Sequence, residues 1–168
     1  MTVPDRDLSR YRPNVGVVLF HPDGRVWYGH RAGSDSPNAW QFPQGGVDDG
    51  EAWEVAARRE LYEETGVRSV EPLGSTDGWI TYAFPEGYGG TKQARGWLGQ
   101  KQKWFAYRFT GPESEIDLEA HGEIEFDAWR WGRLDEACDL IVPFKREAYT
   151  RVVAAFAALA GQGDIGSV

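Results

Sequence analysis

Three glutamates lie close together on one face of a predicted helix. Glu60, Glu63 and Glu64 stand at positions i, i+3 and i+4 of the run 51–65, in which apolar residues recur every three or four positions. At this spacing the carboxylates project toward a common point, and they repel one another unless a cation lies between them. Hard divalent ions such as Mg²⁺ bind carboxylate oxygens and bridge to phosphate oxygens. The pattern therefore predicts metal-assisted attack of water on phosphorus.

Glycines and an arginine at fixed offsets separate this cluster from an ordinary acidic helix. A helix with glutamates at such spacings is usually only a solvated face. Here Gly45 and Gly46 precede the helix and Gly66 follows it, with Glu51 and Arg59 in between. A solvated face does not require glycines at these positions. The arrangement therefore favours the catalytic interpretation.

Residues 45–67, GGVDDGEAWEVAARRELYEETGV, carry the pattern G-x5-E-x7-R-E-U-x-E-E-x-G-U, where U is apolar. This segment resembles the signature of the Nudix hydrolases. The resemblance implies hydrolysis of pyrophosphate bonds in nucleoside polyphosphates with a divalent metal, Mg²⁺, for which Mn²⁺ or Zn²⁺ can substitute. It also implies an α/β fold, an αβα sandwich with a mixed sheet between helices. Metal binding and catalysis fall to Glu60, Glu63 and Glu64, and structural or orienting roles to Gly45, Gly46, Glu51, Arg59 and Gly66.

Five further segments resemble one branch of that family, the bacterial RNA pyrophosphohydrolases and diadenosine tetraphosphate hydrolases. They are YRPNVG at 11–16, WQFPQGG at 40–46, GQKQKWF at 99–105, EFDAWRW at 125–131 and PFKREAY at 143–149. The branch implies one of two substrates, the triphosphorylated 5′ end of RNA or a dinucleoside polyphosphate. A non-catalytic nucleotide sensor is the third hypothesis. The four intact glutamates of the signature argue against it.

The same branch assigns roles outside the helix. Glu125 is expected to complete the metal and catalytic set, and the general base is Glu63, Glu64 or Glu125. Basic residues near the polyphosphate and aromatic residues near the nucleoside form the expected substrate site, although such residues otherwise serve as surface charges or as core. Because Lys101 and Lys103 share a strand face with Phe105, a lysine can face the cleft beside a buried ring. The expected substrate-binding residues are Arg12, Arg31, Tyr82, Lys103, Phe144 and Lys145.

Composition and charge set limits on the protein class. The 168 residues predict one domain over 1–168, with its core at about 11–160. A net charge of −8 argues against a protein that coats nucleic acid, but not against an enzyme that acts on one chain end. Cys138 is the only cysteine and the longest apolar run, 152–160, is too short for a membrane span. We expect a cytoplasmic protein without membrane contact, and the sequence identifies no protein partner.

Strands and helices must position these residues. Apolar or alternating runs predict strands at 14–20, 25–31, 40–42, 79–84, 101–109 and 126–131, the first two joined by the turn HPDG and the third leading into a turn at 43–46. Helices are predicted at 51–65, where Gly66 provides the stop, and at 144–160. Residues 86–98 are predicted to form an exposed loop. This order indicates a mixed sheet with helices packed on it.

Overall fold

The computed structural model describes residues 8–87 and 96–161. Its strands are β1 (Tyr11–Phe20), β2 (Val26–Arg31), β3 (Trp40–Gln41), β4 (Gln44–Gly46), β5 (Val70–Ser75), β6 (Ile80–Ala83), β7 (Gly99–Phe109) and β8 (Phe126–Gly132). Its helices are α1 (Trp53–Thr65), α3 (Ala137–Leu140) and α4 (Arg146–Ala160). Short 3₁₀ turns occur at η1 (Glu113–Glu115), η2 (Leu134–Glu136) and η3 (Pro143–Lys145).

The sheet is mixed, as predicted, and its centre is a parallel pair. β1 and β7 run side by side from Tyr11↔Gly99 to Phe20↔Arg108. The strand order is β3-β2-β1-β7-β5, with β4 on β1, β6 on β7 and β8 on β2. Although the turn after β1 forms the predicted hairpin, β1 and β2 pair only at Phe20↔Val26. The first half of β1 instead pairs with β4, which brings the glycines of the signature onto the central strand.

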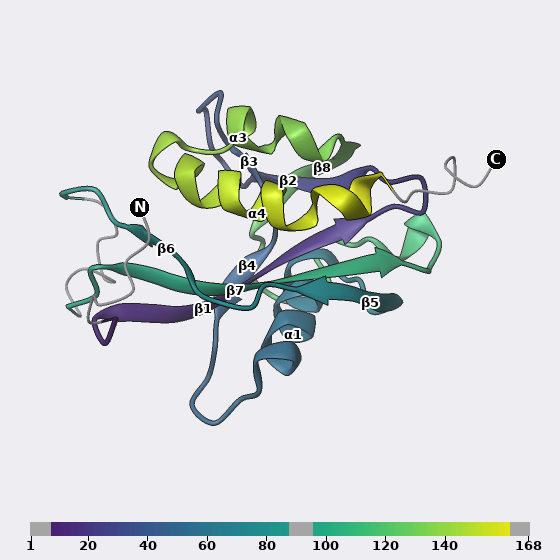
Figure 1. Ribbon diagram of the computed structural model, residues 1–168. Helices are drawn as coiled ribbons and strands as arrows, with labels where there is room; N and C mark the ends of the chain where they lie inside the picture. Colours follow the sequence, from purple (N-terminus) through teal and green to yellow (C-terminus); the bar gives the residue numbers. More distant parts are fainter. Residues whose placement is uncertain (1–7, 88–95, 162–168) are drawn as a thin grey trace.

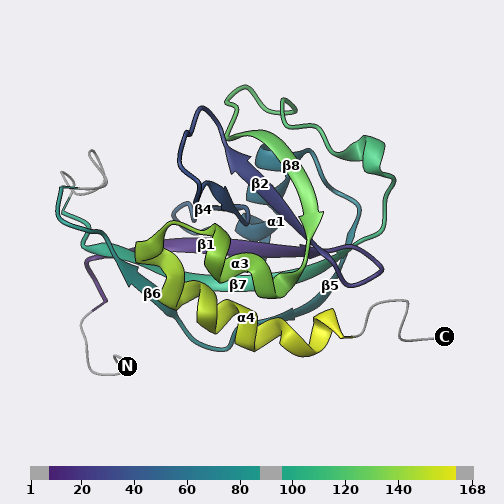
Figure 2. The same ribbon diagram turned by 90° about the horizontal axis from the view of Figure 1, so that it is seen from above.

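Helices cover both faces of the sheet, which confirms the αβα sandwich. Helix α1 lies on one face, and α3 and α4 lie on the other (Figure 1). Viewed from above, α3 and α4 cross in front of the central strands, with α1 behind them (Figure 2). Alternate residues of β1 fill the two cores: Val17 belongs to the core that contains Leu61 of α1, whereas Val18 belongs to the core that contains Phe156 of α4. Within the described residues, no helix is long and apolar enough to cross a bilayer.

Several boundaries differ from the predictions. Helix α1 begins at Trp53 rather than at position 51, because the Glu51 side chain turns back to Arg59 and to the Asp48 N–H. It ends as predicted at Gly66, whose φ of 78° is readily adopted by glycine. The predicted turn at 43–46 contains β4. The closing helix starts as a 3₁₀ turn, η3, before α4.

Strand β5 was not predicted, because Pro72 and Gly74 interrupt the pattern of alternating residues. The register of β5 against β7 shifts between these two residues, so the strand accommodates them as an irregularity. Of the predicted loop at 86–98, residues 88–95 lie outside the described part of the chain. Leu98 is already in the sheet region, where its carbonyl oxygen accepts the Phe84 N–H at 2.9 Å.

Candidate active site

Arg59 ties the loop before α1 to the helix itself. Its Nε and Nη2 donate to the two carboxylate oxygens of Glu51 at 2.7 and 2.8 Å, a bidentate pair. Nη2 also donates to the Gly46 carbonyl oxygen at 2.9 Å, and Nη1 to Glu60 Oε1 at 2.9 Å. The hydrogen bonds from Arg59 lower the pKa of Glu51 to about 2. These contacts support the orienting roles expected of Glu51 and Arg59.

Replacing Arg59 by Lys should destabilise the fold, because the three donors of one ammonium cannot reproduce the bidentate pair with Glu51 together with the bonds to Glu60 and Gly46. We expect a loss of about 1–3 kcal/mol in the free energy of unfolding at pH 7. The pKa of Glu51 is about 2 in the folded protein, below its ordinary value of 4.5, so its stabilisation is present above pH 4.5 and is lost as the pH falls toward 2. Urea unfolding should therefore show that the difference in free energy of unfolding between variant and wild type becomes smaller from pH 5 to pH 3. A gap that is independent of pH would contradict this account.

Glu60 and Glu64 form the centre of the candidate site. Glu64 is only 7% exposed, and its Oε1 accepts the Gln44 N–H at 3.2 Å. The two carboxylates are within hydrogen-bonding reach of each other. Burial raises the pKa of both, and the charges of Glu60 and Glu125 raise that of Glu64 further. A Cβ at position 45 would overlap the Glu60 carboxylate, so the glycine leaves room for this carboxylate.

This pair fits a divalent cation. Two carboxylates of like charge in contact, one buried and one partly buried, require either a shared proton or a cation, and an all-oxygen donor set suits Mg²⁺-type ions. The other two predicted ligands are arranged differently. Glu63 contacts Arg59 (Nη1 to Oε2, 3.3 Å), and Glu125 is exposed but close enough to influence Glu64. Within residues 8–87 and 96–161, no three or more His, Cys, Asp or Glu side chains are already gathered as a metal-binding group.

Most of the predicted substrate-binding residues form one connected group. Lys145 is 7% exposed, and its Nζ lies 5.3 Å from the Tyr82 ring centroid and 5.9 Å from that of Phe144. Gln100 Nε2 donates to the Tyr82 hydroxyl at 2.6 Å, and Arg12 Nη1 donates to Gln100 Oε1 at 3.4 Å. A Cβ at position 46 would overlap the Arg12 guanidinium, so this glycine leaves the space that Arg12 occupies.

The remaining two predicted residues lie elsewhere. Arg31 ends β2 beside Ala32, whose N–H donates to the Glu125 carbonyl oxygen at 3.0 Å, so Arg31 is next to a predicted ligand. Lys103 lies on the face of β7 that packs toward α1, with its Nζ 5.1 Å from the Trp53 ring. It is therefore separated by the sheet from the group around Lys145.

Sequence reasoning missed a buried polar network that supports the site. Gln102 Nε2 donates to Asn14 Oδ1 at 2.8 Å and to Gln44 Oε1 at 3.2 Å, while Trp104 Nε1 donates to Gln102 Oε1 at 3.0 Å. Gln44 is the residue whose backbone N–H reaches Glu64. Buried polar groups are retained when they are hydrogen-bonded. The alternation of Gln and Lys in GQKQKWF could have indicated this network. Residues that alternate along a strand face opposite sides, so the two glutamines share the face that is covered on the α4 side.

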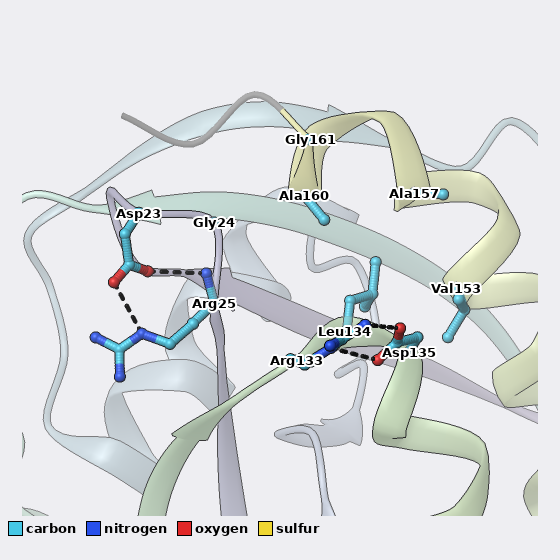
Figure 3. Close-up of a pocket in the computed structure, with 10 residues that line it drawn as sticks. All are labelled: Asp23, Gly24, Arg25, Arg133, Leu134, Asp135, Val153, Ala157, Ala160 and Gly161. Carbon is cyan, nitrogen blue, oxygen red and sulfur yellow. Dashed lines mark hydrogen bonds and ion pairs between the residues drawn. The ribbon is translucent and has the colours of Figure 1, made fainter. Parts of the chain in front are cut away.

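A pocket of about 440 Å³ lies away from this site, between the β1–β2 turn and the end of α4 (Figure 3). Its charged residues already pair with each other, Arg25 with Asp23 at 2.8 Å and Arg133 with Asp135 at 2.6 Å. Leu134 contributes an apolar wall. None of the predicted catalytic or substrate-binding residues lines it.

Comparison with known proteins agrees with this fold and identifies the family. The NUDIX domain matches residues 10–152, and the chain belongs to the Nudix family. Such hydrolases generally require divalent metal cations, in keeping with the carboxylate pair. Two solved structures share the fold: E. coli dihydroneopterin triphosphate pyrophosphohydrolase (TM-score 0.66, 22% identity, 86% of this chain and 98% of that one) and C. elegans Ap4A hydrolase (TM-score 0.57, 20% identity, 86% and 98%).

Curated relatives narrow the position within the family. The chain is 70% identical over 159 residues to an RNA pyrophosphohydrolase of Caulobacter vibrioides. This match covers 94% of this chain and 92% of the relative. It is 52% identical to an RNA pyrophosphohydrolase of Bradyrhizobium sp., over 90% of this chain and 95% of the relative. The chain is thus a Nudix hydrolase of the RNA pyrophosphohydrolase branch, as the segments outside the signature predicted.

Proposed function

We propose that the protein converts 5′-triphosphorylated RNA to 5′-monophosphorylated RNA, with release of pyrophosphate. The observation that carries this proposal is the 70% identity to an RNA pyrophosphohydrolase over nearly the whole of both chains. The carboxylate pair and the group of Arg12, Tyr82 and Lys145 supply the matching chemistry. We infer a cytoplasmic location, where such RNA ends are available.

Each group of residues at the site has its own role in the proposed reaction. We assign Glu60 and Glu64, with Glu63 and Glu125 nearby, to holding Mg²⁺, which when bound activates water and withdraws charge from phosphate. Lys145 and Arg12 neutralise phosphate oxygens as negative charge shifts onto the leaving pyrophosphate. Tyr82 and Phe144 present aromatic faces beside Lys145, suited to the first bases. The water proton passes to whichever of Glu63, Glu64 and Glu125 the metal does not saturate.

The alternative is asymmetric hydrolysis of diadenosine tetraphosphate, which uses the same phosphate-binding groups but requires a place for a second adenosine. The fold shared with C. elegans Ap4A hydrolase, at 20% identity, bears on the fold alone. A protein with a net charge of −8 should bind RNA mainly through local basic groups near the 5′ end, and more weakly as salt rises.

A competition assay decides between the two substrates. With Mg²⁺ and equal concentrations of 5′-triphosphorylated RNA and diadenosine tetraphosphate, we expect both to be cleaved and RNA to have the higher kcat/KM. RNA with a 5′ hydroxyl is the matched control and should compete poorly. A clearly higher kcat/KM for the dinucleotide, with little competition from triphosphorylated RNA, would make the alternative the function.

A further inference from the structure

Two tryptophans and two lysines form a patch on the α1 side of the sheet, here called the Trp–Lys patch: Trp53, Trp79, Lys101 and Lys103. The two indole rings meet edge to face, with centroids 5.0 Å apart. Lys103 Nζ lies 5.1 Å from the Trp53 ring and 5.2 Å from the Trp79 ring, and Lys101 Nζ lies 5.0 Å from Trp79. All four residues are only partly buried, so the patch is open to solvent in part.

The two ammonium groups of this patch have no ion-pair partner among the residues that the structure describes. Many arginines in the described residues have a carboxylate partner, for example Arg25 with Asp23 and Arg130 with Glu136. Over the same residues, 8–87 and 96–161, no carboxylate forms an ion pair with Lys101 or Lys103. In a chain of net charge −8, two adjacent ammonium groups without an ion pair in the described part of the chain are a local site for anions.

The patch lies close to the carboxylate pair. Trp53 precedes Glu60 by seven residues, two helical turns, so both project from the same face of α1 roughly 10 Å apart along its axis. The sheet gives a similar separation: Lys103 is opposite Val15 on β1, and Val15 is opposite Gly45, above which the Glu60 carboxylate lies. Two strand spacings are also about 10 Å. A few nucleotides of an extended chain can bridge this distance.

The patch is distinct from the substrate group around Lys145. Side chains alternate along β7, so Gln100 and Gln102 point toward Tyr82 and the α4 side, whereas Lys101 and Lys103 point toward α1. A chain that leaves the carboxylate site can therefore pass over either face. Aromatic faces alternating with lysines are the arrangement that binds single-stranded nucleic acid, through stacking and phosphate contacts.

We propose that the Trp–Lys patch binds the RNA chain downstream of its first two nucleotides, with a base stacked on Trp79 and phosphates on Lys101 and Lys103. This inference rests on the proposed action on RNA. Because the patch is near the carboxylate pair, it accommodates only the first few nucleotides. RNA length should therefore improve KM up to about four nucleotides and have little effect beyond that.

Steady-state kinetics on triphosphorylated RNAs of two to ten nucleotides test this inference. Trp79→Leu keeps apolar bulk without an aromatic face, and Lys101→Gln removes one charge. Each should raise KM for the decamer roughly five- to tenfold, with kcat and the dinucleotide kinetics unchanged. Trp79→Phe and Lys101→Arg should restore most of the affinity. Melting temperatures of all four variants report whether the fold is intact.

The inference is overturned if Trp79→Leu and Lys101→Gln leave KM unchanged at every length, or raise it equally for the dinucleotide and the decamer. Failure of the proposed function looks different, because wild-type enzyme would then turn over no RNA of any length. In that event, fluorescence anisotropy with a labelled 5′-hydroxyl decamer still tests the patch. Weaker binding by Trp79→Leu than by Trp79→Phe supports it, and equal binding overturns it.

Discussion

Replacing Glu60 by Gln should lower kcat by roughly a thousandfold, the largest effect expected of any single substitution in this protein. Glutamine keeps the size of the side chain but removes the charge that holds the cation. Glu60 is in contact with Glu64 and Arg59, so it lies at the junction between the carboxylate pair and the orienting arginine. The measurement is single-turnover cleavage of a 5′-triphosphorylated RNA at saturating Mg²⁺.

Glu54→Gln is the matched control, because Glu54 is an exposed glutamate in the first turn of the same helix. It should retain wild-type turnover. Without Mg²⁺, Glu60→Gln should melt no lower than wild type, since it removes one of two like charges in contact. Added Mg²⁺ should stabilise wild type and leave the variant unchanged. Near-normal turnover by Glu60→Gln would mean that the assigned ligand is wrong.

The second large effect is expected at Lys145. Changing it to Ala should lower kcat/KM by about a hundredfold or more on any polyphosphate substrate, because the ammonium stabilises charge on the transferring group. Burial between Tyr82 and Phe144 fixes its position and strengthens its interaction with a phosphate. Initial rates on triphosphorylated RNA and on diadenosine tetraphosphate measure the effect.

Arg146→Ala is the control for Lys145→Ala, since Arg146 is the next residue, is exposed, and directs its Nε to the Cys138 carbonyl oxygen at 2.8 Å. Its rates should match wild type. Mg²⁺ affinity should be the same in both variants, because neither residue is assigned to holding the metal. Wild-type rates in Lys145→Ala would show that this lysine only packs against the rings.

The parts of the site that the sequence predicted best are those set by local geometry. The spacing of Glu60 and Glu64 determines their common direction once α1 forms, and Gly66 ends that helix through its backbone conformation. The contact between the two carboxylates follows directly. By contrast, the sequence did not determine where the Glu63 side chain points. Its contact with Arg59 competes with a place beside Glu60 and Glu64, and that contact depends on how the preceding loop folds.

Residues that act through pairing between strands were harder to predict. Gln100 and Gln102 acquire their partners only when β7 is placed parallel to β1 and beneath α4. The position of Lys103 on the α1 side likewise depends on the register of β7, which the alternating sequence alone leaves open. Strand β5 was not predicted because Pro72 and Gly74 are unfavourable in strands. The irregular pairing of β5 with β7 accommodates both residues.

The most direct test of the proposed function identifies the products that purified enzyme forms from 5′-triphosphorylated RNA in Mg²⁺. The carboxylate site and the phosphate-binding group predict equal amounts of pyrophosphate and 5′-monophosphorylated RNA from wild type, and neither product above background from Glu60→Gln. Absence of pyrophosphate with wild-type enzyme, or equal release by Glu60→Gln, would contradict the account.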